Sequence, residues 1–295
     1  MRTLWCLLLM AGCAGSTGGN MDGVDAAVAD VRGEARDGAP EEELGAGADL
    51  PPPVEYRPVV FAVVTDIHLG GGYETPQTQN VLALFEEAAA MSPAPELLVV
   101  TGDLVDAVPE PVDTGAGGRV DALRRLFREG PLPVEAVAGN HDYYSAEFPV
   151  LTLTGDRAAR DAMWDAELAM PRWQVTEHGG TRFIYVNTMQ GDLWDISKGL
   201  NGSAGREQLE WLDGLLSEDR PAVLFMHHPP STVLEAGDLT VEAVIAAHPD
   251  TVLAVFAGHL HMWARSEYEG VPIYLTEAGW DGEGIHHVRV DPEAR

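Results

Sequence analysis

Four consecutive residues near the middle of the chain, Gly139-Asn140-His141-Asp142, combine side chains that could carry out hydrolytic chemistry. The amide oxygen of Asn140 is a neutral group that can bind a metal ion, and His141 can carry a proton near neutral pH. Asp142 can hold neighbouring groups in place by accepting hydrogen bonds. An apolar run at residues 134–138 precedes them and predicts a buried strand, so we expect these four residues on the loop after that strand.

Four further polar motifs also follow apolar runs that are rich in β-branched residues. They are Asp66-Ile67-His68, Gly102-Asp103-Leu104-Val105-Asp106, His227-His228 and Gly258-His259-Leu260-His261. Because the loops at the carboxyl ends of strands converge in an open α/β sheet, we expect these motifs to meet in space. Together they supply enough carboxylate, imidazole and amide ligands for two metal ions. A single D-x-H or H-x-H is common by chance, but five such pieces in order indicate a shared site.

The apolar patterns predict strands that alternate with helices. Strands are expected at residues 59–64, 97–100, 134–138, 181–188, 222–226, 251–257, 272–276 and 287–290, and helices at residues 81–88, 120–127, 161–169, 206–216 and 241–247. This alternation is typical of an α/β fold. No break in composition interrupts the chain after residue 57, so we expect residues 57–295 to form one domain.

The composition excludes some classes of partner and ligand. The chain has 295 residues and a formal net charge of −29, so it lacks the basic surface expected for binding duplex nucleic acid. A small anionic substrate is still compatible, because bound dications would make the local field positive. The only two cysteines are Cys6 and Cys13, so a metal site in the folded domain must use oxygen and nitrogen ligands.

The first thirteen residues resemble the export signal of bacterial lipoproteins. Arg2 supplies a positive charge, residues 4–10 are mostly apolar, and two small residues precede Cys13. In such lipoproteins the cysteine is lipid-modified and becomes the mature N-terminus. We therefore expect residues 1–12 to be a signal peptide and the protein to be exported to the cell envelope, anchored to the membrane by a lipid on Cys13. The alternative is a chance apolar start on a cytosolic protein.

Residues 13–56 predict an acidic, disordered linker. From residue 14 to residue 56 the chain carries ten Asp or Glu against two Arg and has few large apolar side chains. Such a segment cannot bury enough apolar surface to offset the entropy of ordering. We expect it to be a flexible tether that holds a catalytic domain, residues 57–295, away from the membrane.

Taken in order, the five motifs resemble those of the calcineurin-like metallophosphoesterases. That pattern is D-x-H, G-D-x-x-D, G-N-H-(D/E), a lone H and G-H-x-H, and here it spans residues 59–262. The resemblance implies two β-sheets packed as a sandwich and flanked by helices. It also implies a ligand set, with Asp66, His68 and His261 on the first metal, Asn140, His227 and His259 on the second, and Asp103 bridging the two.

The implied chemistry is hydrolysis of a phosphoester. Two dications can share a water and lower its pKa until it is a hydroxide that attacks phosphorus. The leaving oxygen then needs a proton, and His141 is the expected general acid because it adjoins Asn140 but is not a ligand in the family scheme. Asp106 is expected to hydrogen-bond to His141 and favour its protonated form, while Asp142 supports the loop.

Several points stay open in the sequence. The metals could be Mn, Fe, Zn or Ni, the small phosphoester substrate could be a monoester or a diester, and the oligomeric state is not specified. The sequence looks closer to the compact phosphatase and phosphodiesterase branch, which includes class III cyclic-nucleotide phosphodiesterases. A non-catalytic, metal-binding envelope lipoprotein that serves as an interaction module is the alternative function. Tyr143, Tyr144 and Trp263 adjoin the motifs and are candidates for the pocket wall, and for His228 we expect a local hydrogen bond.

Overall fold

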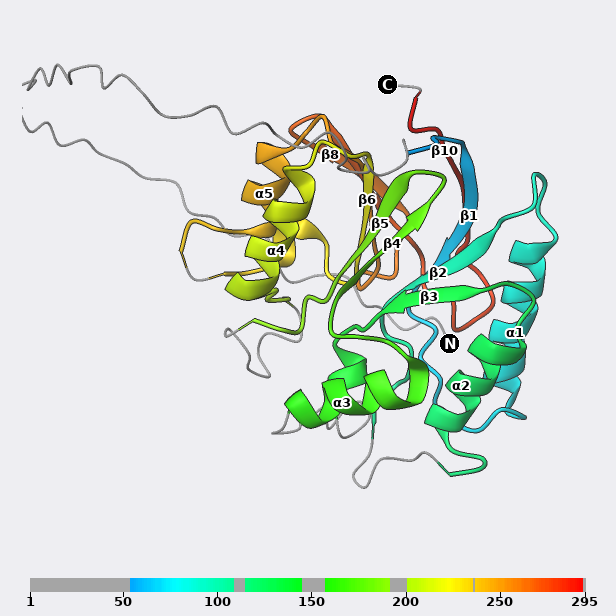
Figure 1. Cartoon of the computed structure of the whole chain (residues 1–295). Coiled ribbons are helices and arrows are strands. Elements are labelled where there is room, and N and C mark those ends of the chain that lie inside the picture. Colours follow the sequence, from blue (N-terminus) through cyan, green and yellow to red (C-terminus); the bar gives the residue numbers. More distant parts are fainter. Residues whose placement is uncertain (1–53, 109–114, 145–156, 192–200, 236, 294–295) are drawn as a thin grey trace, which may run out of the picture. The chain divides into compact units, whose positions relative to one another are not determined.

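The computed structural model describes residues 54–108, 115–144, 157–191, 201–235 and 237–293. In these ranges the chain forms two β-sheets that pack face to face, with helices on both outer faces (Figure 1). The α/β sandwich flanked by helices that the sequence predicts is therefore confirmed. The predicted signal peptide, Cys13 and most of the predicted linker lie outside the described residues, so the domain boundaries stay predictions.

The first sheet has four strands in the order β10-β1-β2-β3. These strands are β1 (Val59–Val64), β2 (Leu97–Thr101), β3 (Val134–Val137) and β10 (His286–Val290). β1, β2 and β3 run parallel, and β10 is antiparallel to β1. β1 and β2 are apolar almost throughout because this sheet is covered on both faces, by the second sheet and by helices.

The second sheet has six strands in the order β4-β5-β6-β7-β9-β8. These strands are β4 (Gln174–His178), β5 (Thr181–Val186), β6 (Ala222–Met226), β7 (Val252–Ala257), β8 (Ala264–Tyr268) and β9 (Val271–Leu275). The four inner strands are parallel, and β4 and β8 run antiparallel at the two edges. Sequence analysis missed both edge strands, because their half-exposed sequences, QVTEH and ARSEY, lack an apolar run.

Five helices cover the two outer faces (Figure 1). They are α1 (Pro76–Ala89), α2 (Arg119–Glu129) and α3 (Arg157–Leu168), which pack in one core with the first sheet, and α4 (Arg206–Leu216) and α5 (Val241–Ala247), which pack on the second sheet. All five lie close to the predicted positions. α1 begins a turn earlier than predicted, because Pro76 suits the first helical position and the hydroxyl of Thr75 accepts from the Thr78 amide.

The core between the sheets is built from alternate residues of the strands. In β1, Val59, Phe61 and Val63 face the second sheet, whereas Ala62 and Val64 face the helices. Aromatic rings fill the space between the sheets, with Phe61 in edge-to-face contact with rings of β5, β6 and β7 at centroid distances of 4.9, 5.7 and 5.9 Å. This packing fixes where the strands end, and the polar motifs begin at those ends.

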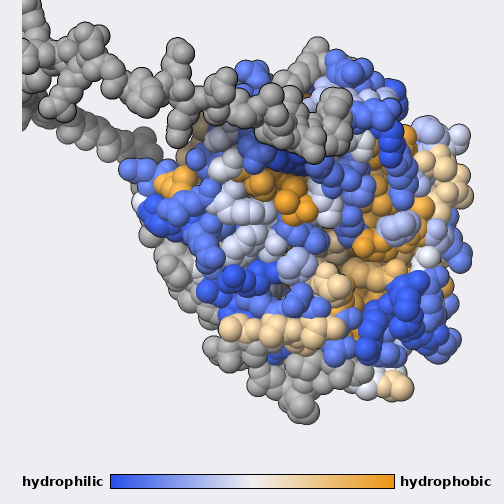
Figure 2. Space-filling view, in the orientation of Figure 1, coloured by the Kyte–Doolittle hydropathy of each residue, from blue (hydrophilic) through white to orange (hydrophobic). Residues whose placement is uncertain are grey.

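None of the helices in the described ranges is both long enough and apolar enough to cross a bilayer. On the face seen in Figure 2, hydrophilic residues cover much of the surface and apolar residues form smaller patches between them.

Candidate metal centre

The structure brings the predicted ligands of the first metal together at the carboxyl ends of the strands. Asp66, His68, Asp103 and His261 each offer one ligand atom, and these atoms all lie within 4.8 Å of one another. The Nε2 atom of His261 is 3.0 Å from Asp66 Oδ1. The Nε2 atom of His68 is 3.7 Å from the same oxygen and 3.5 Å from Asp103 Oδ2.

The predicted ligands of the second metal form a second group that shares Asp103. The Oδ1 atom of Asn140 is 2.9 Å from His227 Nε2 and 3.1 Å from His259 Nδ1. His227 Nε2 is also 3.2 Å from Asp103 Oδ2, the oxygen that faces His68. All seven predicted ligands therefore converge, although their individual roles as ligands stay predictions.

The donor atoms fit divalent metal ions in spacing and in chemistry. Two ligands that bind one ion at right angles and at about 2.0–2.2 Å are about 3 Å apart, close to the shorter distances found here. His68 Nε2 is buried and has no hydrogen-bond partner among the described residues. The Nδ1–H of His227 donates to the carbonyl of Thr101 (3.0 Å), which leaves Nε2 facing the Asn140 oxygen. Two such acceptors can face each other only when a cation lies between them or a proton sits on one of them.

Five of the seven predicted ligands have a backbone conformation that side chains rarely adopt. Their φ angles are positive, at 51° for Asp66, 41° for His68, 50° for Asp103, 70° for His259 and 50° for His261. Each such residue costs roughly 1–3 kcal/mol when it is not glycine. This strain is concentrated where the side chains must turn toward one another, which is typical of functional sites.

Two glycines of the motifs are required by close packing. A Cβ atom at Gly139 would lie 2.2 Å from Asp103 Oδ1, and one at Gly258 would lie 1.9 Å from the hydroxyl of Thr65 and 2.5 Å from Asp66 Oδ2. Only glycine lets these loops approach the carboxylates. The glycines before Asn140 and His259 are therefore required, because the Cβ atom of any other residue would overlap neighbouring atoms.

Hydrogen bonds orient both central carboxylates so that one oxygen of each faces the cluster. Asp66 Oδ2 accepts from the hydroxyl of Thr65 (2.7 Å) and from the amide of His259 (3.0 Å), which leaves Oδ1 toward His261. Asp103 Oδ1 accepts from the amide of His141 (2.8 Å), which leaves Oδ2 toward the histidines. Such outer contacts set the geometry of a metal site as much as the ligands do.

Asp142 supports the loops, as expected from the sequence. Its buried carboxyl group accepts from the amides of Gly139 (2.7 Å), Leu104 (3.0 Å) and Val105 (3.0 Å). It therefore ties the loop after β3 to the loop after β2. Burial and the charge of Asp103 raise the pKa of Asp142 to about 7, while the three amide donors favour its ionised form.

The contact between Asp106 and His141 differs from the expected one. The Nδ1 atom of His141 lies 2.7 Å from the backbone carbonyl of Asp106, whereas the Asp106 carboxylate is 3.6 Å away, beyond a good hydrogen bond. The same carboxylate is 3.7 Å from His68 Nδ1. Burial lowers the pKa of His141, but the charge of Asp103 and the contacts with the carboxylate and the carbonyl of Asp106 outweigh it, so the net shift is upward as expected.

Trp280 and Thr188 lie at the site but were not predicted from the sequence. Trp280 contacts both His261 and His68 edge-on, at centroid distances of 4.5 and 4.9 Å. The hydroxyl of Thr188 lies 2.7 Å from Nδ1 of His228, which is the local hydrogen bond expected for that histidine. Thr188 and Trp280 follow β5 and β9, so the signal that identified the other motifs, polar or aromatic residues after an apolar strand, could have found them.

The three aromatic candidates for the pocket wall have different environments. Tyr143 is not in the wall: it is buried in η1 (His141–Tyr143), and its hydroxyl donates to Asp161 (2.5 Å). Tyr144 is also buried, with its hydroxyl 3.4 Å from the amide nitrogen of Asn140. Trp263 is exposed and lies against His286.

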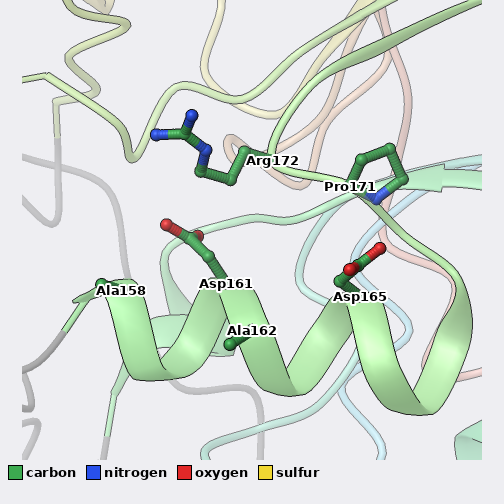
Figure 3. A pocket seen from close by; sticks show the side chains of 6 residues that line it. All are labelled: Ala158, Asp161, Ala162, Asp165, Pro171 and Arg172. Atoms are coloured by element: carbon green, nitrogen blue, oxygen red, sulfur yellow. The ribbon is translucent and has the colours of Figure 1, made fainter.

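A separate cavity of about 380 Å³ lies against α3. It is lined by Ala158, Asp161, Ala162, Asp165, Pro171 and Arg172 (Figure 3). Figure 3 shows both aspartates pointing from the helix toward the segment that carries Pro171 and Arg172. None of the predicted ligands lines this cavity, and one of its lining residues, Asp161, accepts a hydrogen bond from the hydroxyl of Tyr143 in η1.

Comparison with known proteins places the chain in a family. The calcineurin-like phosphoesterase pattern matches residues 59–263, so the chain belongs to the calcineurin-like phosphoesterase family. A 3',5'-cyclic-nucleotide phosphodiesterase of Nostoc sp. is 26% identical over 234 residues, which cover 74% of this chain and 77% of that protein. A cAMP/cGMP dual specificity phosphodiesterase of Mycobacterium tuberculosis is 28% identical over 238 residues, covering 74% and 67%.

Two solved structures of low sequence identity align with most of this chain. The phosphopantetheinyl hydrolase of Mycobacterium tuberculosis gives a TM-score of 0.45 at 16% identity and covers 82% of this chain and 99% of its own. A purple acid phosphatase from yellow lupin seeds gives 0.46 at 12% identity, covering 81% and 47%. At these values neither structure bears on the substrate.

The metal-free protein should lose stability as the pH rises above neutral. Burial lowers the pKa values of His68 and His227, but the surrounding carboxylates raise them to about 10 and about 9. Because the unfolded histidines titrate near about 6.5, the folded chain keeps protons that the unfolded chain releases. The contribution of these two histidines to the free energy of unfolding is complete below about pH 6.5. Between about pH 7 and pH 9 it should fall by up to about 1.4 kcal/mol per pH unit for each histidine.

Thermal unfolding of chelator-treated protein over this pH range would measure the effect. Metal-loaded protein is the control, because metal ions replace the protons and the increase in Tm caused by metal should grow with pH. The variant His68→Gln should flatten the pH dependence of the chelated protein. A Tm of the chelated protein that stays constant or rises toward pH 9 would contradict the proton-for-metal exchange.

The variant Gly258→Ala should destabilise the site, because its Cβ would overlap Thr65 and Asp66. Overpacking of this kind costs about 1–3 kcal/mol, which corresponds to a Tm lower by about 2–4 °C per kcal/mol. Gly214→Ala is the matched control, since Gly214 lies exposed in α4 and a Cβ there meets nothing within 4 Å. Equal Tm values for the two variants would show that Gly258 has no steric role.

Proposed function

We propose that this protein is a metal-dependent phosphodiesterase that hydrolyses small phosphodiesters at a two-metal centre. The observation that carries the proposal is the position of Asp103 Oδ2, which faces His68 of one donor group at 3.5 Å and His227 of the other at 3.2 Å. One carboxylate oxygen shared by two sets of N and O donors suits a pair of bridged divalent ions. The ions would be Mn, Fe, Zn or Ni.

Two divalent ions bound here would polarise the phosphoryl oxygens and lower the pKa of a shared water, so that it acts as the nucleophile near neutral pH. Asp66, His68 and His261 would hold the first ion, and Asn140, His227 and His259 the second. Asp103 would bind both ions.

In this proposal His141 protonates the leaving oxygen of the ester. Its Nδ1–H donates to the carbonyl of Asp106, so Nε2 is the atom that would carry the transferred proton. The raised pKa of His141 favours the protonated form of the imidazole. Asp106 contributes through its backbone carbonyl, which accepts from Nδ1–H at 2.7 Å, and through its carboxylate, which lies 3.6 Å from the same nitrogen.

The names of the relatives support a diester as the substrate. Two relatives that are 26% and 28% identical to this chain over the aligned residues are named as phosphodiesterases of cyclic nucleotides, so cyclic nucleotides are the first substrates to test. A non-catalytic metal-binding role is less well supported, because this chain has the full set of predicted ligands and the acid, and all of them meet at one edge.

The variant His141→Gln should keep its metal but lose activity, and the loss should be greatest for substrates whose leaving group needs a proton. With Mn²⁺ present, we expect the purified protein to cleave bis(p-nitrophenyl) phosphate. On a diester with an alkyl leaving group, His141→Gln should slow turnover by about 10²–10⁴-fold, and the loss on the p-nitrophenyl ester should be much smaller. Asp106→Asn should give the same trend with smaller losses, because the carbonyl that orients His141 is retained.

The control is Asp213→Asn, which removes a carboxylate of α4 that lies 2.8 Å from His248, the C-cap residue of α5, and should leave all rates unchanged. Metal content of every variant is measured in parallel. Equal slowing of good and poor leaving groups by His141→Gln would reject the general acid role. Absence of hydrolysis in a metal-loaded wild-type protein would reject the enzyme and favour the interaction module.

We also propose that the protein is exported and held in the cell envelope by a lipid on Cys13. The support is the sequence of residues 1–13, with one positive charge, a short apolar run and small residues before the cysteine. The variant Cys13→Ser should move the protein from the membrane fraction to the soluble fraction of a bacterial host. Cys6→Ser is the matched control and should stay with the membranes. Membrane association that does not depend on Cys13 would reject the anchor.

A further inference from the structure

We propose that an apolar rim beside the metal centre binds the organic part of the substrate and selects esters with an aromatic or similarly flat apolar group. We define this apolar rim as Leu260, Met262, Trp263 and Trp280. The inference rests on the proposed phosphodiesterase function and adds to it the chemical class of the ester group that is not cleaved.

The first observation is the concentration of exposed apolar side chains at the G-H-x-H motif. Leu260 is 45% exposed, Met262 49% and Trp263 45%, and they alternate with the predicted ligands His259 and His261. Among the described residues, seven large apolar side chains are at least 37% exposed, and three of the seven lie within residues 260–263. Such a local concentration of exposed apolar area marks a binding surface.

The second observation is a tryptophan from a different part of the chain. Trp280 follows β9, and its loop is fixed by a hydrogen bond from the amide of Gly279 to the carbonyl of Thr65 (2.8 Å). The indole lies edge-on to His261 and His68, with interplanar angles of 86° and 65°, and is itself only partly buried. Trp280 therefore contacts the same ligand histidine, His261, that Leu260 and Met262 flank in the chain.

The position of the rim identifies its occupant. The side chain of His261 is 36% exposed, whereas those of Asp66, Asp103 and His227 are 1% exposed or less, so the cluster is open to solvent at His261 as well as at His141 and Asp106. With the leaving oxygen at His141, the ester group that is not cleaved would lie on the His261 side, next to the rim. Flat rings gain most from such a surface, because aromatic and thioether side chains pack well against π-systems.

The test uses three diesters that share a p-nitrophenyl leaving group and differ only in the second ester group, which is methyl, phenyl or 2-naphthyl. Because the leaving group is constant, differences in kcat/KM report binding of the second group. We expect kcat/KM to rise from methyl to phenyl to 2-naphthyl, by at least about fivefold over the series. In the variants Trp263→Ser, Met262→Ser and Trp280→Ala the rise should shrink to less than about twofold.

Two controls accompany the series. Val175→Ser removes an apolar side chain of similar exposure, 37%, from the edge strand β4 and should retain the full preference. Metal content is measured for Trp280→Ala, because this residue contacts two predicted ligands. Loss of metal in that variant, with the preference retained in the other two, would assign Trp280 to ligand support and overturn its part in the rim.

The outcomes separate this inference from the proposed function. Hydrolysis of all three diesters at equal kcat/KM by the wild type would overturn the rim and leave the phosphodiesterase intact. No hydrolysis of any diester by metal-loaded protein would mean that the proposed function itself has failed. If the Trp263 and Met262 variants changed sedimentation or binding to phosphatidylcholine vesicles but not the preference, the rim would be a subunit or membrane contact and the inference would be wrong.

Discussion

The compensation of negative charge at one buried point is the constraint on which the rest of the structure depends. Asp66 and Asp103 are almost fully buried, and Asp106 is nearby, so three carboxylates share one small volume. Carboxylates in such a place must be neutralised by cations. In the metal-free protein His68 and His227, whose pKa values are raised, carry protons that neutralise this charge. Metal ions bound to the same nitrogen atoms would replace these protons.

The two-sheet frame explains how so strained a cluster is held. Five predicted ligands have left-handed backbone angles, a cost that isolated loops would avoid by rearranging. Here each loop leaves a strand whose two faces are packed, against aromatic rings on one side and helices on the other. Asp142 then joins two of these loops through three amide donors. The packed strands and a few buried hydrogen bonds therefore offset the strain in the backbone of the five predicted ligands.

The inner strands and the helices could be predicted from the sequence because each depends on local chemistry. The seven converging donors were predicted from the motifs at the strand ends together with the family resemblance. Continuous apolar runs such as β1 and β6 have one interpretation when polar motifs follow them. The edge strands β4 and β8 were missed because an edge strand with exposed faces needs little apolar sequence, and its place is set by the neighbouring strand. The carbonyl contact of Asp106 and the approach of Trp280 depend on tertiary geometry, which spacing in the sequence does not encode.

The acidity of the chain limits what such a centre can accept. A protein of net charge −29 repels polyanions at long range, although bound dications would attract a phosphoryl group within the few ångströms of the site. Salt screens the long-range part over about 8–10 Å, so a small ester with one phosphate can enter, whereas a nucleic acid duplex would place many phosphates against acidic surface. With electrostatic attraction confined to the centre, the remaining affinity must come from uncharged contacts. The apolar residues beside His261 are positioned to provide them.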